Sequence, residues 1–326
     1  MKPVTFVMEG GPVNKPLLSV GALVIVTMAW GSTFFIIKDA ISIVDPADFL
    51  AARFTIAAIL LVAVSWRRLL RLTWQQWGTG LGLGAIYGVG QVVQTIGLRH
   101  TDASVSGFIT GTYVVITPLL LWVIFRRRVA SRTWLSVGLA VAGLAVLSIT
   151  GMSGGGVGEL LTLLGAALYA LHIVFLDRSA GRMDALSLTA VQLIGVAATC
   201  TAIALPGSTG TLPDMSAWGA ILYTAVIAGA LTMLLQTWAQ GHLSPTKVAV
   251  VMTLEPVFAT AFAVALGGET LTGRLLAGGA LILAATVIGV LTGDAAHPPH
   301  VTDDPDDHRS PLGNESPETA HAAPTN

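Results

Sequence analysis

One acidic residue stands in the middle of a long apolar stretch in the second half of the chain. Glu255 lies within residues 247–267, directly before Pro256. A carboxyl group held among apolar side chains can act as a handle for a proton or a cation, because burial makes its charge costly. It can equally be a packing group that hydrogen-bonds a neighbouring helix. Both interpretations stay open, and Glu255 is the candidate residue for ion coupling.

Other polar and aromatic side chains occur in apolar stretches at helical spacing. Tyr87, Gln91 and Gln94 follow an i, i+4, i+7 pattern, so they share one face of a helix. Tyr169 and His172 are three residues apart and also share a face. Such stripes either line a cavity or join helices by hydrogen bonds. The candidates for a solute pathway are Trp30, Thr33, Tyr87, Gln91, Gln94, Tyr113, Tyr169, His172, Gln192 and Gln236.

Arg53 is a basic residue inside an apolar stretch. Pairing with Asp45 or Asp48 near the surface is the simpler interpretation, and attraction of an anionic solute group is the alternative. The phosphate-loop pattern GxxxxGK[ST] and the zinc pattern HExxH are both missing from the sequence. Cys200 is the single cysteine, and no Cys/His metal spacing occurs. We therefore expect no catalytic residues, no metal and no cofactor.

Ten apolar stretches hold these residues. The chain of 326 residues is 53% hydrophobic and 11% charged, whereas about 25% of residues are charged in typical soluble domains. A stretch of about 20 apolar residues spans a bilayer, and it must be helical because lipid offers its backbone no hydrogen-bond partners. The sequence therefore predicts an all-α integral membrane protein with ten transmembrane helices, and it lacks the basic face that nucleic acid requires. The stretches are residues 17–37, 47–66, 76–98, 104–125, 133–150, 159–177, 185–205, 217–239, 247–267 and 274–292.

Basic residues concentrate in alternate loops. With the N-terminus in the cytoplasm, 13 of the 17 Lys and Arg residues fall on the cytoplasmic side, and only Lys38, Arg99 and Arg274 fall outside. This bias predicts a multi-pass protein of the plasma (inner) membrane with both termini cytoplasmic. The expected partners are membrane lipid and a small-molecule solute, without nucleic acid. Coupling to a proton or cation is left open.

The chain repeats itself at about 140 residues. Each half contains five spans, an odd number, so the second half enters the membrane from the opposite side. Two inverted five-helix repeats are a recurring plan of secondary transporters, because similar halves of opposite orientation can exchange conformations. The paired prolines are the expected helix bends. The corresponding residues, at offsets of 138 to 142, are Trp30 and Tyr169, Thr33 and His172, Asp45 and Asp184, Gln94 and Gln236, and Pro118 and Pro256.

The repeats divide the chain into five parts. The two repeats are separated by a stretch rich in glycine, and the C-terminal part is rich in proline and acidic residues, a composition typical of disorder. The parts are a cytoplasmic N-terminal segment (1–16), the first five-helix repeat (17–150), the linker (151–158), the second repeat (159–292) and an acidic cytoplasmic tail containing Pro and His (293–326).

Four motifs resemble those of the EamA-type family of the drug/metabolite transporter superfamily. They are Trp30-Gly31-Ser32-Thr33-Phe34-Phe35, Pro46…Phe49…Arg53, Phe108-Ile109-Thr110-Gly111…Pro118, and Leu254-Glu255-Pro256-Val257-Phe258…Gly268-Glu269. The resemblance covers residues 17–292. It departs from the family at Arg126-Arg127-Arg128, where relatives often carry a glutamate. The resemblance implies a ten-helix transporter, usually an exporter of amino acids or other small metabolites, driven by an ion gradient or by exchange.

The function we expect is secondary active export of a small metabolite, amino-acid-like or otherwise polar or amphipathic, by alternating access between the inverted repeats. No enzymatic activity is expected. One alternative is an integral-membrane enzyme acting on a lipid-soluble substrate, which needs acids or metal ligands converging at one membrane face. The other is a channel or a sensor, and conductance would separate a channel from a carrier.

Overall fold

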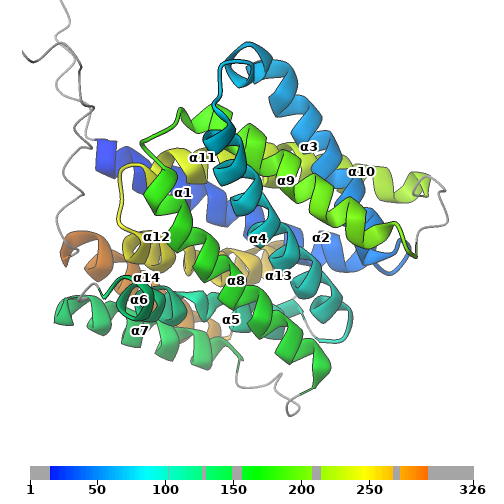
Figure 1. Ribbon diagram of the computed structural model, residues 1–326. Helices are drawn as coiled ribbons and strands as arrows, with labels where there is room; N and C mark the ends of the chain where they lie inside the picture. Colours follow the sequence, from blue (N-terminus) through cyan, green and yellow to red (C-terminus); the bar gives the residue numbers. More distant parts are fainter. Residues whose placement is uncertain are drawn as a thin grey trace, which may run out of the picture.

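The computed structural model describes residues 15–101, 103–126, 130–148, 156–207, 214–266 and 272–292. The expected N-terminal segment, glycine-rich linker and acidic tail lie wholly or mostly outside the described residues, as do Arg127, Arg128 and Glu269. The described residues form helices joined by short connections (Figure 1).

The helices group into ten spans, each ending within three residues of its predicted boundary. This confirms the all-α membrane fold and its division into two halves of five spans. In chain order the spans are α1 (Lys15–Gly31) with α2 (Thr33–Ala40); α3 (Pro46–Leu69); α4 (Trp74–Arg99); α5 (Ala103–Gly111) with α6 (Tyr113–Phe125); α7 (Ser131–Ser148); α8 (Val157–Ser179); α9 (Ala185–Ala204); η1 (Met215–Ala217), α10 (Trp218–Ala225), η2 (Val226–Leu231) and α11 (Thr232–Gln240); α12 (Pro245–Met252) with α13 (Leu254–Leu266); and α14 (Gly273–Thr292).

The outer surface of the bundle is apolar, as lipid requires. Six of the helical segments are each long and apolar enough to cross a bilayer, and three shorter apolar helices accompany them. Large apolar side chains point outward along these segments: Ile59 is 64% exposed, Val64 is 65% exposed and Leu160 is 68% exposed. An exposed apolar belt of this extent is stable against hydrocarbon and not against water.

The spans pack as a two-fold arrangement of the halves. Each span corresponds to the span five places later in the chain. The third span, α4, packs along the sixth, α8, and its counterpart, α11 of the eighth span, packs along α1 of the first. The pairs α3 with α9 and α7 with α14 are their own counterparts under this relation, and the two helices of each pair pack against each other. Contacts between the halves therefore hold the bundle together.

Small residues allow the backbones of α4 and α9 to touch. A Cβ atom added at Gly195 of α9 would lie 2.7 Å from the carbonyl oxygen of Leu81, closer than real Cβ contacts. On α4, Gly80 and Gly84 face Val191 and Gln192 of α9 in the same way. Glycines spaced by four along α4 thus form one close helix–helix interface.

Three spans are interrupted near their middles, each at a hydroxyl residue. The interruptions fall at Ser32, Thr112 and Thr253. Each hydroxyl donates a hydrogen bond of 2.6 Å to the carbonyl oxygen three residues earlier, and this back-bonding competes with the helical ladder and bends the helix. The first, fourth and ninth spans are therefore each divided into two helical segments.

The interruptions do not coincide with the prolines that we expected to bend the helices. Pro118 lies inside α6, six residues after Thr112. Pro256 lies in the first turn of α13, three residues after Thr253. Proline removes a backbone donor wherever it sits, so bending at Pro118 and Pro256 stays a prediction about motion.

Candidate functional site

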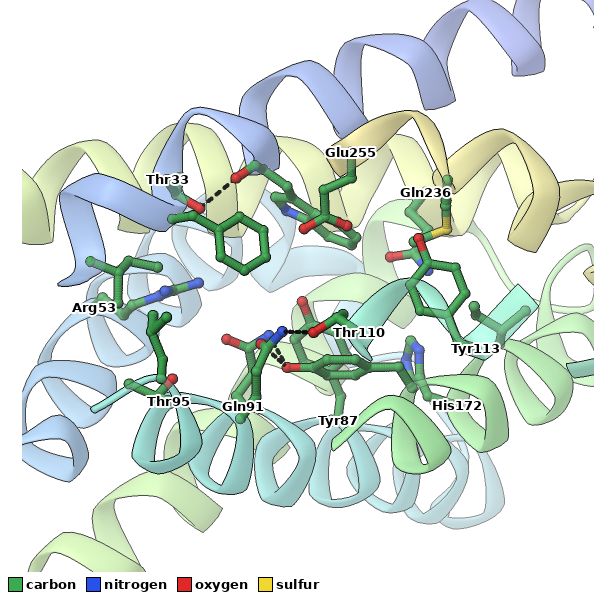
Figure 2. Close-up of a pocket in the computed structure, with 18 residues that line it drawn as sticks. Thr33, Arg53, Tyr87, Gln91, Thr95, Thr110, Tyr113, His172, Gln236 and Glu255 are labelled. Atoms are coloured by element: carbon green, nitrogen blue, oxygen red, sulfur yellow. Dashed lines mark hydrogen bonds between the residues drawn. The ribbon is translucent and has the colours of Figure 1, made fainter. Parts of the chain in front are cut away.

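One cavity lies between the two halves of the bundle. It encloses about 690 Å³ of space free of protein atoms, open solvent at its mouth included. Side chains from seven of the ten spans surround it (Figure 2). They are Trp30, Thr33, Phe34, Ile37, Arg53, Tyr87, Gln91, Gln94, Thr95, Leu98, Thr110, Tyr113, Tyr169, His172, Ile173, Gln236, Met252 and Glu255.

Nine of the ten pathway candidates line this cavity, and so does Glu255. The exception is Gln192 of α9, which lies behind the wall. Its Oε1 is 2.8 Å from Nε2 of His172, and its Nε2 donates to the hydroxyl of Thr237 at 3.3 Å. Gln192 therefore orients a lining residue from outside the cavity.

The interrupted spans contribute to the cavity on both sides of each break. Trp30 and Thr33 flank Ser32, Thr110 and Tyr113 flank Thr112, and Met252 and Glu255 flank Thr253, and all six line the cavity. The backbone N–H of each break residue is still paired within its span, and irregular backbone of this kind is tolerated at bilayer depth where it adjoins a cavity. The three breaks thus converge on one place in the membrane.

A chain of hydrogen bonds crosses the cavity wall between the halves (Figure 2). Gln91 donates from Nε2 to the Tyr169 hydroxyl at 2.7 Å, and this hydroxyl donates to Oε1 of Gln94 at 2.7 Å. Gln94 in turn donates from Nε2 to the Thr110 hydroxyl at 2.8 Å. The chain joins α4 and α5 of the first half to α8 of the second.

Trp30 makes the corresponding contact between α1 and the eighth span. Its indole Nε1 donates to the carbonyl oxygen of Ala228 at 3.0 Å and to the Thr232 hydroxyl at 2.9 Å. The segment around Ala228 is η2, a π-helix of six residues. π-Turns concentrate at functional sites. The Ala228 carbonyl also accepts from the Thr232 hydroxyl of its own span at 2.7 Å, so Trp30 adds a second bond from across the interface between the halves.

Aromatic rings form the floor of the cavity. The ring centroid of Tyr87 lies 5.3 Å from that of Tyr169, 5.1 Å from that of His172 and 6.3 Å from that of Phe54. Contacts at these distances fix the orientation of the rings. A flat apolar solute would find preformed area here.

Glu255 is the one acid among the lining residues, and Figure 2 shows it on another helix and at another part of the wall than Arg53. Glu255 is 7% exposed, and no described residue makes a hydrogen bond or ion pair with its carboxylate. It lies in the first turn of α13, where the helix dipole favours negative charge. A Cβ atom at Gly31 of α1 would lie 2.8 Å from the Glu255 carbonyl oxygen, so α1 packs directly on this turn.

Arg53 corrects the sequence interpretation. Of its two interpretations, pairing with Asp45 or Asp48 near the surface does not hold, because the side chain is only 4% exposed and its Nε and Nη1 atoms have no hydrogen-bond partner. Asp45 is engaged instead by Arg99 at 3.4 Å. The Arg53 guanidinium lies over the Phe54 ring, 4.4 Å from the centroid, and lines the cavity.

The cavity reaches much further toward one end of the bundle than toward the other. Its lining extends to Ile37 and Leu98, beside the helix ends where Arg99 meets Asp45. Toward the other end, Gln236 donates to Gln240 at 3.1 Å, and Gln240 donates to the carbonyl oxygen of Ile173 at 3.0 Å. Buried apolar residues close the bundle beyond that point, including Leu243 and Val248.

Sequence reasoning missed the apolar part of the lining. Phe34, Ile37, Leu98, Ile173 and Met252 cannot be told from the surrounding apolar residues in the sequence. Within the described ranges no group of three or more His, Cys, Asp or Glu side chains is placed to hold a metal ion.

Fold and cavity together define a multi-pass membrane transporter, and comparisons with known proteins agree. The model of the EamA-like transporter family matches residues 17–149 and 156–291. The chain therefore belongs to the EamA-like transporter family, with two copies of its domain, and this is a family of transporters rather than enzymes.

Named relatives cover nearly the whole chain. An uncharacterized transporter of Archaeoglobus fulgidus is 30% identical over 287 residues, which are 87% of this chain and 90% of that protein. The uncharacterized inner membrane transporter YedA of Escherichia coli K12 is 27% identical over 285 residues, 82% of this chain and 89% of YedA. A protein of known crystal structure shares the fold, with a TM-score of 0.71 at 18% sequence identity. The match covers 85% of this chain and 97% of the chain in that crystal structure.

Proposed function

We propose that the protein is a secondary active transporter that exports a small polar or amphipathic solute by alternating access. The observation that carries this proposal is the convergence of three interrupted spans on one cavity between two related halves. Movement of one half against the other would open the cavity to each side in turn. The breaks at Ser32, Thr112 and Thr253 are the places where such movement needs the least loss of helical hydrogen bonds.

The closed end of the cavity favours a carrier over a channel. At this end Gln240 of α11 donates to the backbone of Ile173 in α8, and Leu243 and Val248 are buried beyond it, as expected for a carrier in one of its end states. A channel instead needs a path that is open to both sides at once. We infer that the described conformation is one end state of the transport cycle.

The orientation proposed for the chain makes this end state outward-facing. Arginines cluster at the closed end, including Arg68, Arg71 and Arg178, and cytoplasmic loops are rich in such residues. We propose that both termini are cytoplasmic. In a Cys200→Ser background, Ser42→Cys should react with an impermeant maleimide added outside intact cells, and Arg71→Cys should react only after permeabilisation. The opposite labelling would overturn this orientation.

Counterflow in sealed proteoliposomes tests the transport function. Vesicles preloaded with an unlabelled solute should accumulate the labelled solute transiently, above protein-free vesicles, for at least one member of a panel of amino acids and other small metabolites. Folded, monodisperse protein that moves none of them would contradict the proposal. Single-channel conductance with no counterflow would replace the carrier by a channel.

A further inference from the structure

Arg53 carries a buried positive charge, and none of the described acids forms an ion pair with it. Its Nε and Nη1 atoms are buried without a hydrogen-bond partner. The guanidinium is held by stacking on Phe54 at 4.4 Å, and Asp45 at the start of the same helix is bound to Arg99. Figure 2 shows the side chain directed into the cavity. A buried charge in this state is costly unless another group completes its hydrogen bonds.

The symmetry of the halves shows what is missing. Arg53 and Gln192 are 139 residues apart, the same offset that relates Asp45 to Asp184. In the second half the polar atoms of Gln192 are bonded to His172 at 2.8 Å. The residue corresponding to His172 is Thr33, whose hydroxyl instead donates to the carbonyl oxygen of Trp30 at 2.8 Å. The first half therefore has an arginine at the position where the second half has a glutamine bonded to a histidine. The residue corresponding to that histidine, Thr33, makes no hydrogen bond to the guanidinium.

The chemistry of the cavity selects the class of ligand. A guanidinium is a planar fork of donors that matches a carboxylate. Arg53 is the only Lys or Arg that lines the cavity, all of whose lining residues are described, and no ion pair joins it to Glu255, the one lining acid. A dianion such as a phosphate monoester would exceed this single positive charge. Phe34, Ile37 and Leu98 supply apolar walls beyond Arg53.

Building on the transport function proposed above, we propose that Arg53 is an anion subsite and that the solute is a small monocarboxylate with an apolar body. The carboxylate accepts hydrogen bonds from the edge of the guanidinium. The apolar body lies against the aromatic and aliphatic walls. Glu255 remains free for the coupled proton or cation.

Matched acid and amide probes test the subsite on the full-length protein in detergent. The unfolding temperature is measured with increasing phenylacetate or 4-methylvalerate, with phenylacetamide or 4-methylvaleramide, and with sodium chloride at equal ionic strength. We expect the acids to raise the unfolding temperature by about 2 °C or more near saturation, since a ligand stabilises the state that it binds. The amides and the salt should have no such effect.

Variants assign the binding to Arg53. Arg53→Gln carries the residue that the second half has at this position, so the fold should tolerate it, and the acids should bind at least about tenfold more weakly. Arg53→Lys keeps the positive charge but loses the planar fork of donors. Its affinity for the acids should lie between that of the unaltered protein and that of Arg53→Gln. Arg99→Gln removes an exposed arginine at the same end of the bundle and should bind the acids like the unaltered protein.

Three outcomes would overturn the subsite: no stabilisation by either acid, equal stabilisation by the amides, or unchanged acid binding in Arg53→Gln. Each is independent of the counterflow result. Acid binding lost in Arg53→Gln, but with no flux of any solute in proteoliposomes, would contradict the transport proposal and leave the subsite in place. Flux of neutral solutes that is unaffected by Arg53→Gln would support the transport proposal and contradict the subsite.

Discussion

The two halves place corresponding aromatic residues at the cavity and satisfy their polar atoms in different ways. Trp30 of the first half donates to the backbone carbonyl of Ala228 and to Thr232, on a π-helical span. Tyr169 of the second half exchanges hydrogen bonds with Gln91 and Gln94 of a regular helix. Both contacts join the halves at equivalent interfaces. One depends on an unusual backbone and the other on side chains alone.

This difference shows how a duplicated fold becomes asymmetric without losing its architecture. The packing of the spans follows the two-fold relation, because helix–helix interfaces depend on small residues and overall shape. The polar residues are under no such constraint. Arg53 of the first half corresponds to Gln192 of the second, and Thr117 corresponds to Glu255. Among the residues that line the cavity, each half therefore carries one Lys, Arg, Asp or Glu, and its counterpart in the other half is neutral.

The largest effect is expected at Glu255. The Gln variant keeps the size and hydrogen-bonding groups of the side chain but cannot take up a proton at this site. We expect Glu255→Gln to lower the initial rate of counterflow or export by at least about tenfold and to abolish its dependence on pH. The rate is measured in proteoliposomes over a series of pH values.

Thr117→Val is the matched control at the corresponding position of the first half, and it should transport normally. A Glu255→Gln variant with the rate and the pH dependence of the unaltered protein would leave Glu255 as a packing residue. That result would leave the fold and the cavity untouched.

The two aromatic contacts should differ in what they contribute to stability. Tyr169→Phe removes one hydroxyl and breaks two hydrogen bonds between the halves, leaving both glutamine amides short of a partner. We expect a loss of about 1–3 kcal/mol in the free energy of unfolding. Trp30→Phe breaks the contact to Ala228, but this carbonyl keeps its 2.7 Å bond from Thr232. We expect that variant to lose about 1 kcal/mol.

Unfolding in mixed micelles with increasing denaturing detergent measures both losses. A larger loss for Trp30→Phe than for Tyr169→Phe would mean that the π-helix depends on the indole more than on Thr232. The comparison between backbone and side-chain contacts would then be reversed.

The sequence alone predicted the spans and most of the cavity for one physical reason. A polar residue inside an apolar span is costly and therefore conspicuous, and Tyr87, Gln91 and Glu255 were found in this way. Even the interruptions had a signal, because Ser32, Thr112 and Thr253 are hydroxyl residues in mid-span.

What could not be predicted depends on tertiary contacts. Gln192 has the same residue type as Gln91, but the rotation of α9 turns it toward His172 and Thr237, behind the wall. Arg53 is not paired with Asp45 because Asp45 binds Arg99 of another span instead. The π-helix at residues 226–231 has no signal in the sequence that we can identify.

The two aspartates that cap corresponding helices outside the membrane offer a smaller test. Asp184 accepts from Ser187 N and Oγ and binds Arg68 at 2.9 Å, whereas Asp45 accepts from Ala47 N and meets Arg99 at 3.4 Å. Burial alone would raise the pKa of the Asp184 carboxyl, but the hydrogen bonds from Arg68 and Ser187 outweigh it and hold the pKa below its ordinary value.

A lowered pKa means that the folded state favours the charged carboxylate. The stability that Asp184 contributes is therefore fully present above the ordinary pKa of an aspartate, and it is lost as the pH falls through the lowered pKa. At pH 7 we expect Asp184→Ala to cost about 1–2 kcal/mol and Asp45→Ala about 1 kcal/mol, most of it from the cap, because exposed ion pairs contribute little. Unfolding measured at pH 7 and pH 3 should show the cost of Asp184→Ala shrinking at the lower pH. A constant cost would mean that the charge of Asp184 contributes nothing.

The smallest effect is expected at Thr117. Its Oγ1 atom is buried with no hydrogen-bond partner, whereas the Thr253 hydroxyl donates to Val250 at 2.6 Å. Valine has the shape of threonine without the polar group, so Thr117→Val should leave the free energy of unfolding unchanged or raise it by up to about 1 kcal/mol, and Thr253→Val should lower it by about 1 kcal/mol. If Thr117→Val instead slowed transport at unchanged stability, its hydroxyl would have a partner in the opposite end state. That would make the neutral counterpart of Glu255 a part of the transport cycle.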